Sequence, residues 1–323
     1  MSCSSQTPPM KEGKMAGLSL VAGRQEVSEM AWQNVDSTQA NWLSIMPYAF
    51  GKLGDTSLVY NINRQWKGEK ISGAAEVIQQ AHKRGYKIML KPHLWLRGGF
   101  TGHHEFTSDE QWEAWERNYT AYILEFAKLA DSLKVSMFCI GTELGKSAIN
   151  RPLYWQNLIS EIKKVYSGKL TYAANWDTYR QIPFWQQLDY IGIDAYFPLN
   201  TADQNNLQSL QKAWMAYNEE LQGFSKQVNR QIIFTEWGCR SVVNGHQKPW
   251  EHHDGGSVDE KIQKLVYEAF FTTIWQQPYL AGGFVWKWYT DPVSKERIAD
   301  DYTPQGKPAQ EILRVYYQMK TKE

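Results

Sequence analysis

The chain has 323 residues, of which 42% are hydrophobic and 21% charged, and this balance excludes a disordered or a fibrous protein. Its 35 lysines and arginines nearly match its 34 aspartates and glutamates, which argues against a nucleic-acid partner or a polyanionic substrate, because both require a basic surface. The chain is rich in Trp (15) and Tyr (18). Many such rings stay half-exposed because their polar atoms need partners, so they can face a ligand.

The N-terminal segment is polar up to residue 14 and is predicted to be a disordered tail, followed by one folded domain over residues 15–323. Cys3 stands directly before two serines, as at the mature end of a bacterial lipoprotein. We therefore expect an extracytoplasmic, lipid-anchored protein; the alternative is a secreted or cytoplasmic protein with an ordinary disordered terminus. No run of about 18 apolar residues occurs, so no transmembrane segment is predicted. Cys139 and Cys239 lie in apolar runs and are expected to be free thiols.

After the tail, short β-rich runs alternate with segments of helical periodicity. The predicted strands are Met15–Gly23, Trp42–Phe50, Tyr86–Trp95, Val135–Glu143, Lys169–Trp176, Leu188–Phe197, Gln231–Gly238 and Leu280–Trp288. The clearest helices are predicted at Asp109–Leu133, Tyr154–Tyr166, Leu207–Val228, Val258–Gln276 and Pro308–Met319.

Helix punctuation supports these boundaries, since Ser108 precedes two acidic residues as a capped start and Gly85 follows an apolar helical pattern as a stop. Eight strands that alternate with helices predict an α/β fold, a single (β/α)8 barrel. The competing doubly wound sheet would need a Gly-rich phosphate loop after the first strand, and residues 21–25 lack that spacing.

Two predicted strands, the fourth and the seventh, end in the same Thr-Glu pair, at Glu143 and Glu236. Catalytic groups of a (β/α)8 barrel lie at the C-terminal ends of its strands, and these two strands lie nearly opposite each other. Retaining glycoside hydrolysis needs two carboxyl groups about 5–5.5 Å apart, one protonated and one ionised, and proximity itself separates their pKa values. The alternative for either Glu alone is a salt bridge under the barrel rim.

Further motifs occur at the other predicted strand ends. They are Lys91-Pro92-His93, Asn175-Trp176-Asp177, and the segments 193–198 and 283–289. Together with the two Glu-ending strands they resemble the clan A glycoside hydrolases, and in detail family 113, the β-mannanases. The resemblance extends from about residue 17 to residue 317.

This resemblance implies a retaining hydrolase without a cofactor that cleaves β-1,4-mannosidic linkages in mannan, glucomannan or manno-oligosaccharides. The open alternatives are a β-1,4-glucanase or another clan A β-glycosidase, and a barrel that binds glycans without cleaving them.

The resemblance also assigns roles. Glu143 matches the acid/base and Glu236 the nucleophile, while the Tyr196 hydroxyl is expected to steady the ionised nucleophile. Trp286 matches the floor under the sugar at the cleavage point, and His93 is expected to face the same sugar. Each of the last three could instead be an ordinary packing or hydrogen-bonded residue.

One position departs from the clan pattern. Most clan A enzymes have Asn before the acid/base, where it contacts the sugar 2-hydroxyl, whereas this chain has Thr142. Asn175 is our candidate for that contact. Trp95, Trp176, Trp237 and Trp288 are candidate sugar platforms, and Asp177, Asp194 and Asp291 are candidate partners of sugar hydroxyls or members of rim salt bridges.

Other chemistries find little support in the sequence. No zinc-binding His motif occurs, so no metal site is predicted, and the pairs His103-His104 and His252-His253 are expected to be rim residues. The P-loop of phosphoryl transfer and the Gly-x-Ser-x-Gly elbow of serine hydrolases are absent as well.

Overall fold

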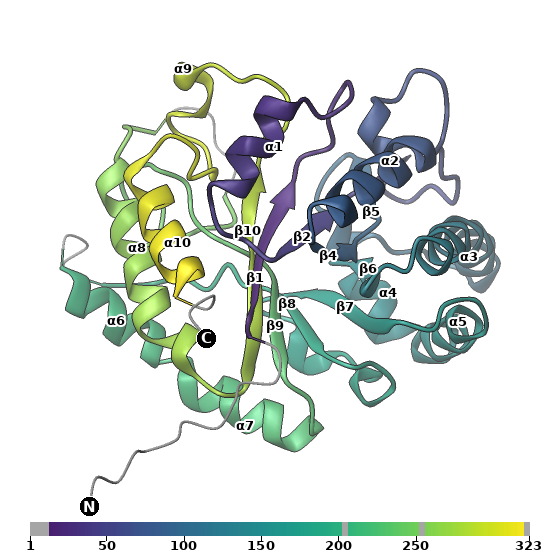
Figure 1. The fold of residues 1–323 in the computed structure, drawn as a ribbon. Helices are drawn as coiled ribbons and strands as arrows, with labels where there is room; N and C mark the ends of the chain where they lie inside the picture. Colours follow the sequence, from purple (N-terminus) through teal and green to yellow (C-terminus); the bar gives the residue numbers. More distant parts are fainter. Residues whose placement is uncertain (1–12, 202–205, 252–255, 320–323) are drawn as a thin grey trace, which may run out of the picture.

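Eight parallel strands close into a barrel in the order β1, β10, β9, β8, β7, β6, β4, β2, with helices arranged around it (Figure 1). This is a computed structural model that describes residues 13–201, 206–251 and 256–319. The barrel strands are β1 (Met15–Leu20), β2 (Trp42–Ile45), β4 (Lys87–Leu90), β6 (Met137–Thr142), β7 (Lys169–Asn175), β8 (Ile191–Asp194), β9 (Ile232–Trp237) and β10 (Leu280–Trp288). The predicted (β/α)8 barrel is confirmed. Cys3 and most of the predicted tail lie outside the described residues.

The helices follow the predicted alternation. They are α1 (Glu29–Asp36), α2 (Ile71–Lys83), α3 (Asp109–Ser132), α4 (Gly145–Asn150), α5 (Pro152–Val165), α6 (Leu207–Met215), α7 (Asn218–Val228), α8 (Glu260–Thr272), α9 (Lys295–Ile298) and α10 (Pro308–Gln318). Short 3₁₀ turns occur at Lys67–Glu69, Thr101–His103, Tyr179–Gln181, Trp185–Gln187 and Ile274–Gln276. None of the helices in these ranges is both long enough and apolar enough to cross a membrane.

Both predicted helix signals are confirmed: the Ser108 hydroxyl accepts from the Gln111 N–H, and Gly85 has φ +82° just after α2. The single helix predicted over Leu207–Val228 is wrong, because the chain breaks into α6 and α7 at residues 216–217. Tyr217 packs its ring 4.7 Å from that of Phe197 and donates to the Pro198 carbonyl. This tertiary contact stabilises a break that carries no Gly or Pro signal.

Two predicted strands are each split in the structure by a proline. Pro47 and Pro92 follow the barrel strands β2 and β4, and β3 (Tyr48–Lys52) and β5 (His93–Arg97) continue as a separate two-stranded parallel sheet. Proline has no N–H to extend a strand ladder. The sheet pairs Tyr48 with His93 and Phe50 with Trp95. We call this two-stranded sheet the rim ribbon, because it extends the chain beyond the barrel mouth.

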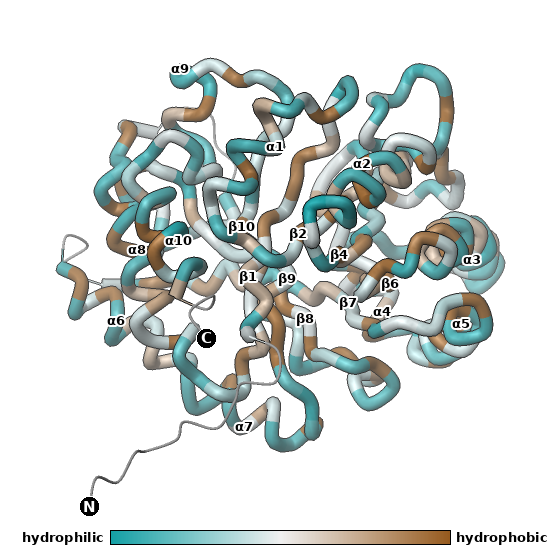
Figure 2. The backbone as a smooth tube through the Cα atoms, in the orientation of Figure 1, coloured by the Kyte–Doolittle hydropathy of each residue, from teal (hydrophilic) through white to brown (hydrophobic). Residues whose placement is uncertain are grey.

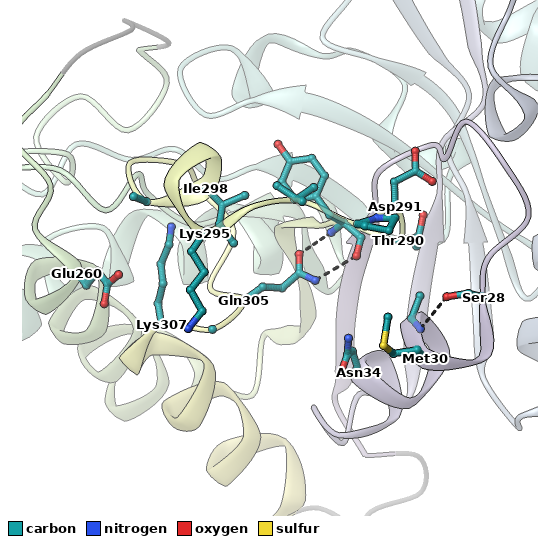
Figure 3. Close-up of a pocket in the computed structure, with 16 residues that line it drawn as sticks. Ser28, Met30, Asn34, Glu260, Thr290, Asp291, Lys295, Ile298, Gln305 and Lys307 are labelled. Carbon is teal, nitrogen blue, oxygen red and sulfur yellow. Dashed lines mark hydrogen bonds between the residues drawn. The ribbon is translucent and has the colours of Figure 1, made fainter.

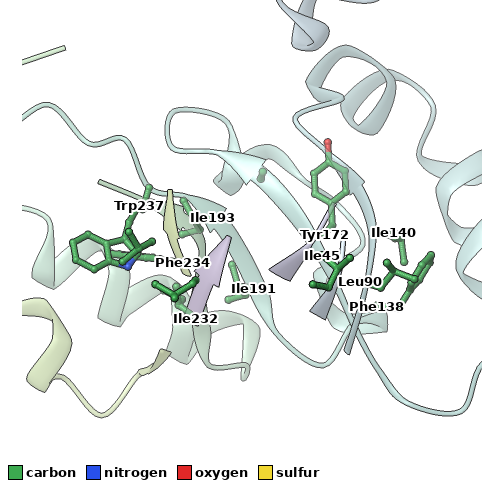
Figure 4. Packing of buried hydrophobic residues seen from close by; sticks show 14 of the residues in the cluster. Ile45, Leu90, Phe138, Ile140, Tyr172, Ile191, Ile193, Ile232, Phe234 and Trp237 are labelled. Carbon is green, nitrogen blue, oxygen red and sulfur yellow. The ribbon is translucent and has the colours of Figure 1, made fainter. Parts of the chain in front are cut away.

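Apolar side chains fill two separate layers. A small cluster inside the barrel contains Met89, Met137, Ile233 and Phe284, and a larger one lies between the strands and the helices, where Figure 4 shows outward residues of β8 and β9. In Figure 2 the barrel strands are largely brown, and the helices carry teal segments. Strand residues alternate between the two layers, which leaves the strand ends to form the mouth.

Gly17 should test how tightly the inner layer is packed. A Cβ added there would lie 2.3 Å from the Phe284 ring, so Gly17→Ala should destabilise the fold by about 1–3 kcal/mol through overpacking. The free energy of unfolding in urea measures this. Gly223→Ala is the matched control, because a Cβ on this residue of α7 meets nothing within 4 Å and Ala favours helix. Equal stability of Gly17→Ala and wild type would contradict the packing described.

Candidate active site

A cleft of about 750 Å³ opens at the C-terminal ends of the barrel strands. Seven of the nine predicted site residues line it: Glu143, Glu236, His93, Asn175, Trp176, Tyr196 and Trp286. They come from six different strand ends, so only the closed barrel brings them together. The cleft continues over other aromatic residues, namely Tyr48, Trp95, Phe100, Trp250 and Tyr302.

A β-bulge turns Glu236 toward the cleft. Along the β8–β9 ladder, Ile193 pairs with Phe234 but Asp194 pairs with Glu236, so β9 holds one extra residue. Strict alternation from Ile233, which faces the barrel interior, would point Glu236 at the helix layer. The extra residue reverses the alternation from this point.

A second bulge precedes the other carboxyl group. In the β6–β7 ladder, Cys139 pairs with Thr171 and Thr142 with Ala173, which leaves an extra residue on β6. Glu143 then adopts φ +52°, an uncommon conformation for a residue with a side chain. Its N–H donates to the Ala173 carbonyl at 2.8 Å, which holds this turn against β7.

Glu236 is 6% exposed, and its carboxylate accepts from two donors on different oxygens. The Tyr196 hydroxyl donates to Oε2 at 2.7 Å, as the sequence analysis expected, and the Lys91 ammonium donates to Oε1 at 2.6 Å. Both hydrogen bonds favour the ionised form of the acid. The Glu236 side chain is therefore held in one orientation at the floor of the cleft.

Lys91 is fully buried and lies between two acids. Its ammonium also donates to Asp194 Oδ1 at 3.1 Å, and the same oxygen accepts from the Thr235 hydroxyl at 2.7 Å. Burial acts to lower the pKa of Lys91, but the charges of Asp194 and Glu236 outweigh it and raise this pKa above its ordinary value. Lys91 is therefore a permanent cation behind the floor of the cleft.

Glu143 has the opposite environment. It is half-buried, and within the described part of the chain no side chain or backbone group hydrogen-bonds its carboxyl. Burial, then the negative charges of Asp194 and Glu236, raise the pKa of Glu143 well above its ordinary value. Two carboxyl groups on one cleft thus have unequal surroundings, since Glu236 has two hydrogen-bond donors and Glu143 has a raised pKa, and general acid catalysis uses such a difference.

His93 and Trp286 form a flat wall beside Glu236. Their rings are parallel within 3°, with centroids 6.0 Å apart, and His93 Nε2 is 3.7 Å from Glu236 Oε1. Burial, helped by the charge of Lys91, lowers the pKa of His93 well below its ordinary value, so the imidazole is neutral. Among the described residues, neither the buried His93 Nε2 nor the buried Thr142 hydroxyl has a hydrogen-bond partner.

Comparison with known proteins identifies the family of the chain. Residues 21–307 match the model of Glycoside Hydrolase Family 113. The chain belongs to this family. A comparison with curated proteins found no match.

Solved structures show the same fold. A family 113 β-mannanase from Alicyclobacillus acidocaldarius, in complex with ManMIm, has a TM-score of 0.84 at 23% identity, over 96% of this chain and 98% of that one. A structure described as a family 113 β-1,4-mannanase complex has the same TM-score and identity, over 95% and 99%. A β-glucuronidase from Faecalibacterium prausnitzii is more distant, with a TM-score of 0.65 at 14% identity, over 95% of this chain and 49% of that one.

In this family 113 chain, two predicted sugar platforms are not in the cleft. Trp237 is 0% exposed and packs against Phe270 of α8 at 4.1 Å (Figure 4 shows it beside Phe234). The bulge that turns Glu236 inward turns the next residue, Trp237, outward. Trp288 is 1% exposed and belongs to the same outer layer. These two predictions are corrected: both rings are packing residues.

The three candidate aspartates have three different positions. Asp177 lines the cleft and accepts from the Asn175 amide at 3.0 Å. Asp194 is a buried ion-pair member rather than a rim residue. Asp291 lies away from the cleft, where it accepts from the Arg24 N–H at 2.8 Å.

Asp291 borders a second hollow of about 350 Å³ between α1 and α9 (Figure 3). Its Gln305 is bonded to the Tyr289 backbone, and its Lys307 donates to the Ser241 hydroxyl and the Asp301 carbonyl. These polar groups are already occupied, and the hollow has no counterpart of the paired carboxyl groups.

The cysteines and histidines singled out in the sequence differ in their positions. Cys139 and Cys239 are free and buried, as predicted. His103 lines the cleft, whereas His104 is buried against Phe106 and Trp115. His252 and His253 lie outside the described residues. Within the described ranges no group of three or more His, Cys, Asp or Glu side chains could hold a metal ion.

Several residues of the site have no role predicted from the sequence. Lys91 was part of a matched motif, and a Lys inside an apolar strand signals a buried ion pair. Tyr48 could have been placed by its position after Pro47, which parallels that of His93 after Pro92. Trp250 contributes a ring stacked 5.1 Å from Trp176, but it lies in an irregular loop without a sequence signal.

The corrected assignment of Trp237 makes a stability prediction. Trp237→Ala should cost about 3–5 kcal/mol because it empties a fully packed site. Trp250→Ala should cost less than about 1 kcal/mol, since this ring is 38% exposed. Thermal or urea unfolding of the two variants distinguishes these roles. If Trp237→Ala lowers the free energy of unfolding less than Trp250→Ala does, the position of Trp237 in the outer layer is wrong.

Proposed function

We propose that this family 113 chain is a retaining glycoside hydrolase that cleaves β-1,4-mannosidic linkages by double displacement. The observation that carries the proposal is the unequal pair on one cleft: Glu236 accepts hydrogen bonds from Lys91 and Tyr196, and burial raises the pKa of Glu143. Glycoside hydrolysis requires such a pair, and the retaining course is inferred from the resemblance to family 113. Mannan, glucomannan and manno-oligosaccharides are the proposed substrates.

In the first step the Glu236 carboxylate attacks the anomeric carbon, and the bond to the leaving sugar oxygen breaks. Glu143 donates its proton to that oxygen, so the leaving sugar departs as an alcohol. Glu236 becomes a neutral ester and Glu143 an anion. The loss of the Glu236 charge makes it easier for Glu143 to remain ionised, because the repulsion between the two groups has gone.

In the second step Glu143 acts as the base. It takes a proton from a water molecule, whose oxygen attacks the anomeric carbon and breaks the ester to Glu236. The sugar leaves with its original stereochemistry after two inversions, and both acids return to their starting states. Lys91 and Tyr196 stabilise the carboxylate that this step regenerates.

The lining of the cleft favours a neutral sugar. Among the described lining residues the only ionisable acids are Glu143, Asp177 and Glu236, and none is Lys or Arg. Lys91 is behind Glu236 and is shielded from the cleft. Recognition of a carboxylate-bearing sugar normally uses a Lys or Arg, so a glucuronide is disfavoured although β-glucuronidases share the fold.

Mannose is supported by the likeness to two β-mannanases and is compatible with Thr142 at the position where most clan A enzymes have Asn. Mannose has an axial 2-hydroxyl, and Thr142 and His93 each offer it an unpartnered polar atom. A β-1,4-glucanase is the alternative substrate class, and a barrel that only binds glycans is the alternative to an enzyme.

The two carboxyl groups predict different variant phenotypes. Glu236→Ala should abolish turnover of mannohexaose, since no nucleophile remains. Glu143→Ala should lower it by about 10²–10⁴-fold, because the proton donor is lost, yet keep glycosylation with substrates whose leaving group needs no proton. Mass spectrometry of products from manno-, cello- and xylo-oligosaccharides in parallel measures turnover and substrate class together.

Two outcomes would contradict the proposal. Near-wild-type rates in both variants would show that these acids are not the catalytic pair. Cleavage of cello-oligosaccharides with mannan untouched would replace the mannanase by a β-glucanase. Trp250→Ala serves as a cleft control, because it changes sugar contact without removing either acid.

The dependence of kcat/KM on pH should show how the charge of Asp194 affects the pKa of Glu143. Burial first, then the charge of Glu236, raise the pKa of Asp194 to about 7, and Asp194 is in turn the largest charge that raises the pKa of Glu143. Asp194→Asn removes a negative charge, so ionised Glu143 becomes less costly and its pKa falls. The basic limb of kcat/KM against pH should therefore move to lower pH.

Asp177→Asn is the matched control for this experiment. Asp177 raises the pKa of Glu143 least among the causes found, so its removal should move the basic limb in the same direction by less. A limb that stays in place in Asp194→Asn would contradict the assignment of Glu143 as the acid.

A further inference from the structure

A hollow of about 520 Å³ lies beyond the cleft, beside the rim ribbon. Its lining includes Phe50, Val59, Arg64, Trp66 and Glu69. Trp66 is 41% exposed, which is unusual for a residue with so much apolar surface. No step of the proposed reaction uses this hollow.

The rim ribbon joins the hollow to the cleft through one continuous face. Because side chains alternate along a strand and the two strands are in register, Tyr48 and Phe50 of β3 share a face with His93 and Trp95 of β5. The Tyr48 and Phe50 centroids are 6.2 Å apart, and those of Phe50 and Trp95 are 6.1 Å apart. Tyr48 and Trp95 line the cleft, and Phe50 lines the hollow.

This aromatic face is held rigidly from behind. Ala49, on the opposite face of the ribbon, is fully buried in the protein. The outer edge of β3 is paired as well, since Phe50 and Val59 exchange two backbone hydrogen bonds of 2.8 Å. Trp95 nevertheless remains 54% exposed. An exposed ring on a fixed backbone loses little freedom when a ligand covers it.

Trp66 and Arg64 supply the far wall of the hollow. The Arg24 guanidinium lies 4.7 Å from the Trp66 ring centroid and packs against the indole, and the Trp66 backbone N–H donates to Glu69 Oε2 at 2.9 Å, which fixes the main chain at this residue. Arg64 is exposed and forms no ion pair with a described residue. Its guanidinium can donate hydrogen bonds to hydroxyl groups.

We propose that the hollow between Phe50 and Trp66 is a distal subsite for the glycan chain whose cleavage point lies at Glu236. The chain would leave the cleft over Trp95 and Phe50 and place a further neutral sugar unit against Trp66 and Arg64. Continuity of the aromatic face is the reason to assign the hollow to the same chain rather than to another ligand. The inference rests on the proposed function and adds a preference for long chains.

The test compares chain lengths in Trp66→Ala, Arg64→Ala and wild type. For manno-oligosaccharides too short to reach the hollow, kcat/KM should be unchanged. For the longest oligosaccharides and soluble mannan, Trp66→Ala should lower kcat/KM by about tenfold, which corresponds to about 1.4 kcal/mol. Trp66→Phe should recover most of the loss, because it restores an aromatic ring. Leu153→Ala, an exposed apolar truncation on α5, should leave every length unchanged.

Binding measured in the Glu143→Gln background separates the two proposals. There, calorimetry should show weaker binding of long chains, but not of short ones, when Trp66→Ala is added. If wild type cleaves mannan and Trp66→Ala affects all lengths equally or none, the distal subsite is wrong while the proposed function stands. If wild type cleaves no β-glycan, the proposed function is wrong, and unchanged long-chain binding in the Glu143→Gln/Trp66→Ala protein would overturn the subsite independently.

Discussion

The site depends on one buried cation placed between two acids. Lys91 shares its ammonium between Glu236 and Asp194 with no solvent access. Removing three charges from water is costly, and the cost is offset only when each charge has a close, well-oriented partner. Asp194 matters for this balance in the proposed reaction, because Glu236 loses its charge when it becomes an ester. Asp194 would then remain as the counter-ion of Lys91, and the buried cation would not be left alone.

The β-bulges point the two acidic side chains into the cleft. Without the extra residue on β9, Glu236 would point into the helix layer and Trp237 into the cleft. The similar irregularity on β6 and the positive φ of Glu143 place the second acid on the same opening. Both acids therefore owe their directions to backbone irregularities next to them, which fits the general occurrence of bulges beside active sites.

Much of this architecture could be predicted from the sequence, because hydrophobic runs, Ser108 and Gly85 are local signals. Glu143, Glu236 and Tyr196 could be located because they end predicted strands in matched motifs. The directions of the Trp237 and Trp288 side chains could not be predicted from the sequence. A β-bulge has no characteristic residue pattern, and a shift of one residue moves a side chain to the other face of the strand. Contacts from irregular loops, such as Trp250 on Trp176, depend on the closed fold and lie beyond local patterns.

The two prolines at the barrel rim have a consequence for how the protein could diversify. Pro47 and Pro92 end the barrel ladder, so the ribbon that follows is a separate hydrogen-bonded unit on top of a finished barrel. Insertions, deletions or exchanged aromatic residues beyond these prolines would leave the register of β2 and β4 intact. The chain thus keeps its charged machinery on the barrel and its outer aromatic contacts on the ribbon, and the part of the ribbon beyond His93 can vary without disturbing the charged groups.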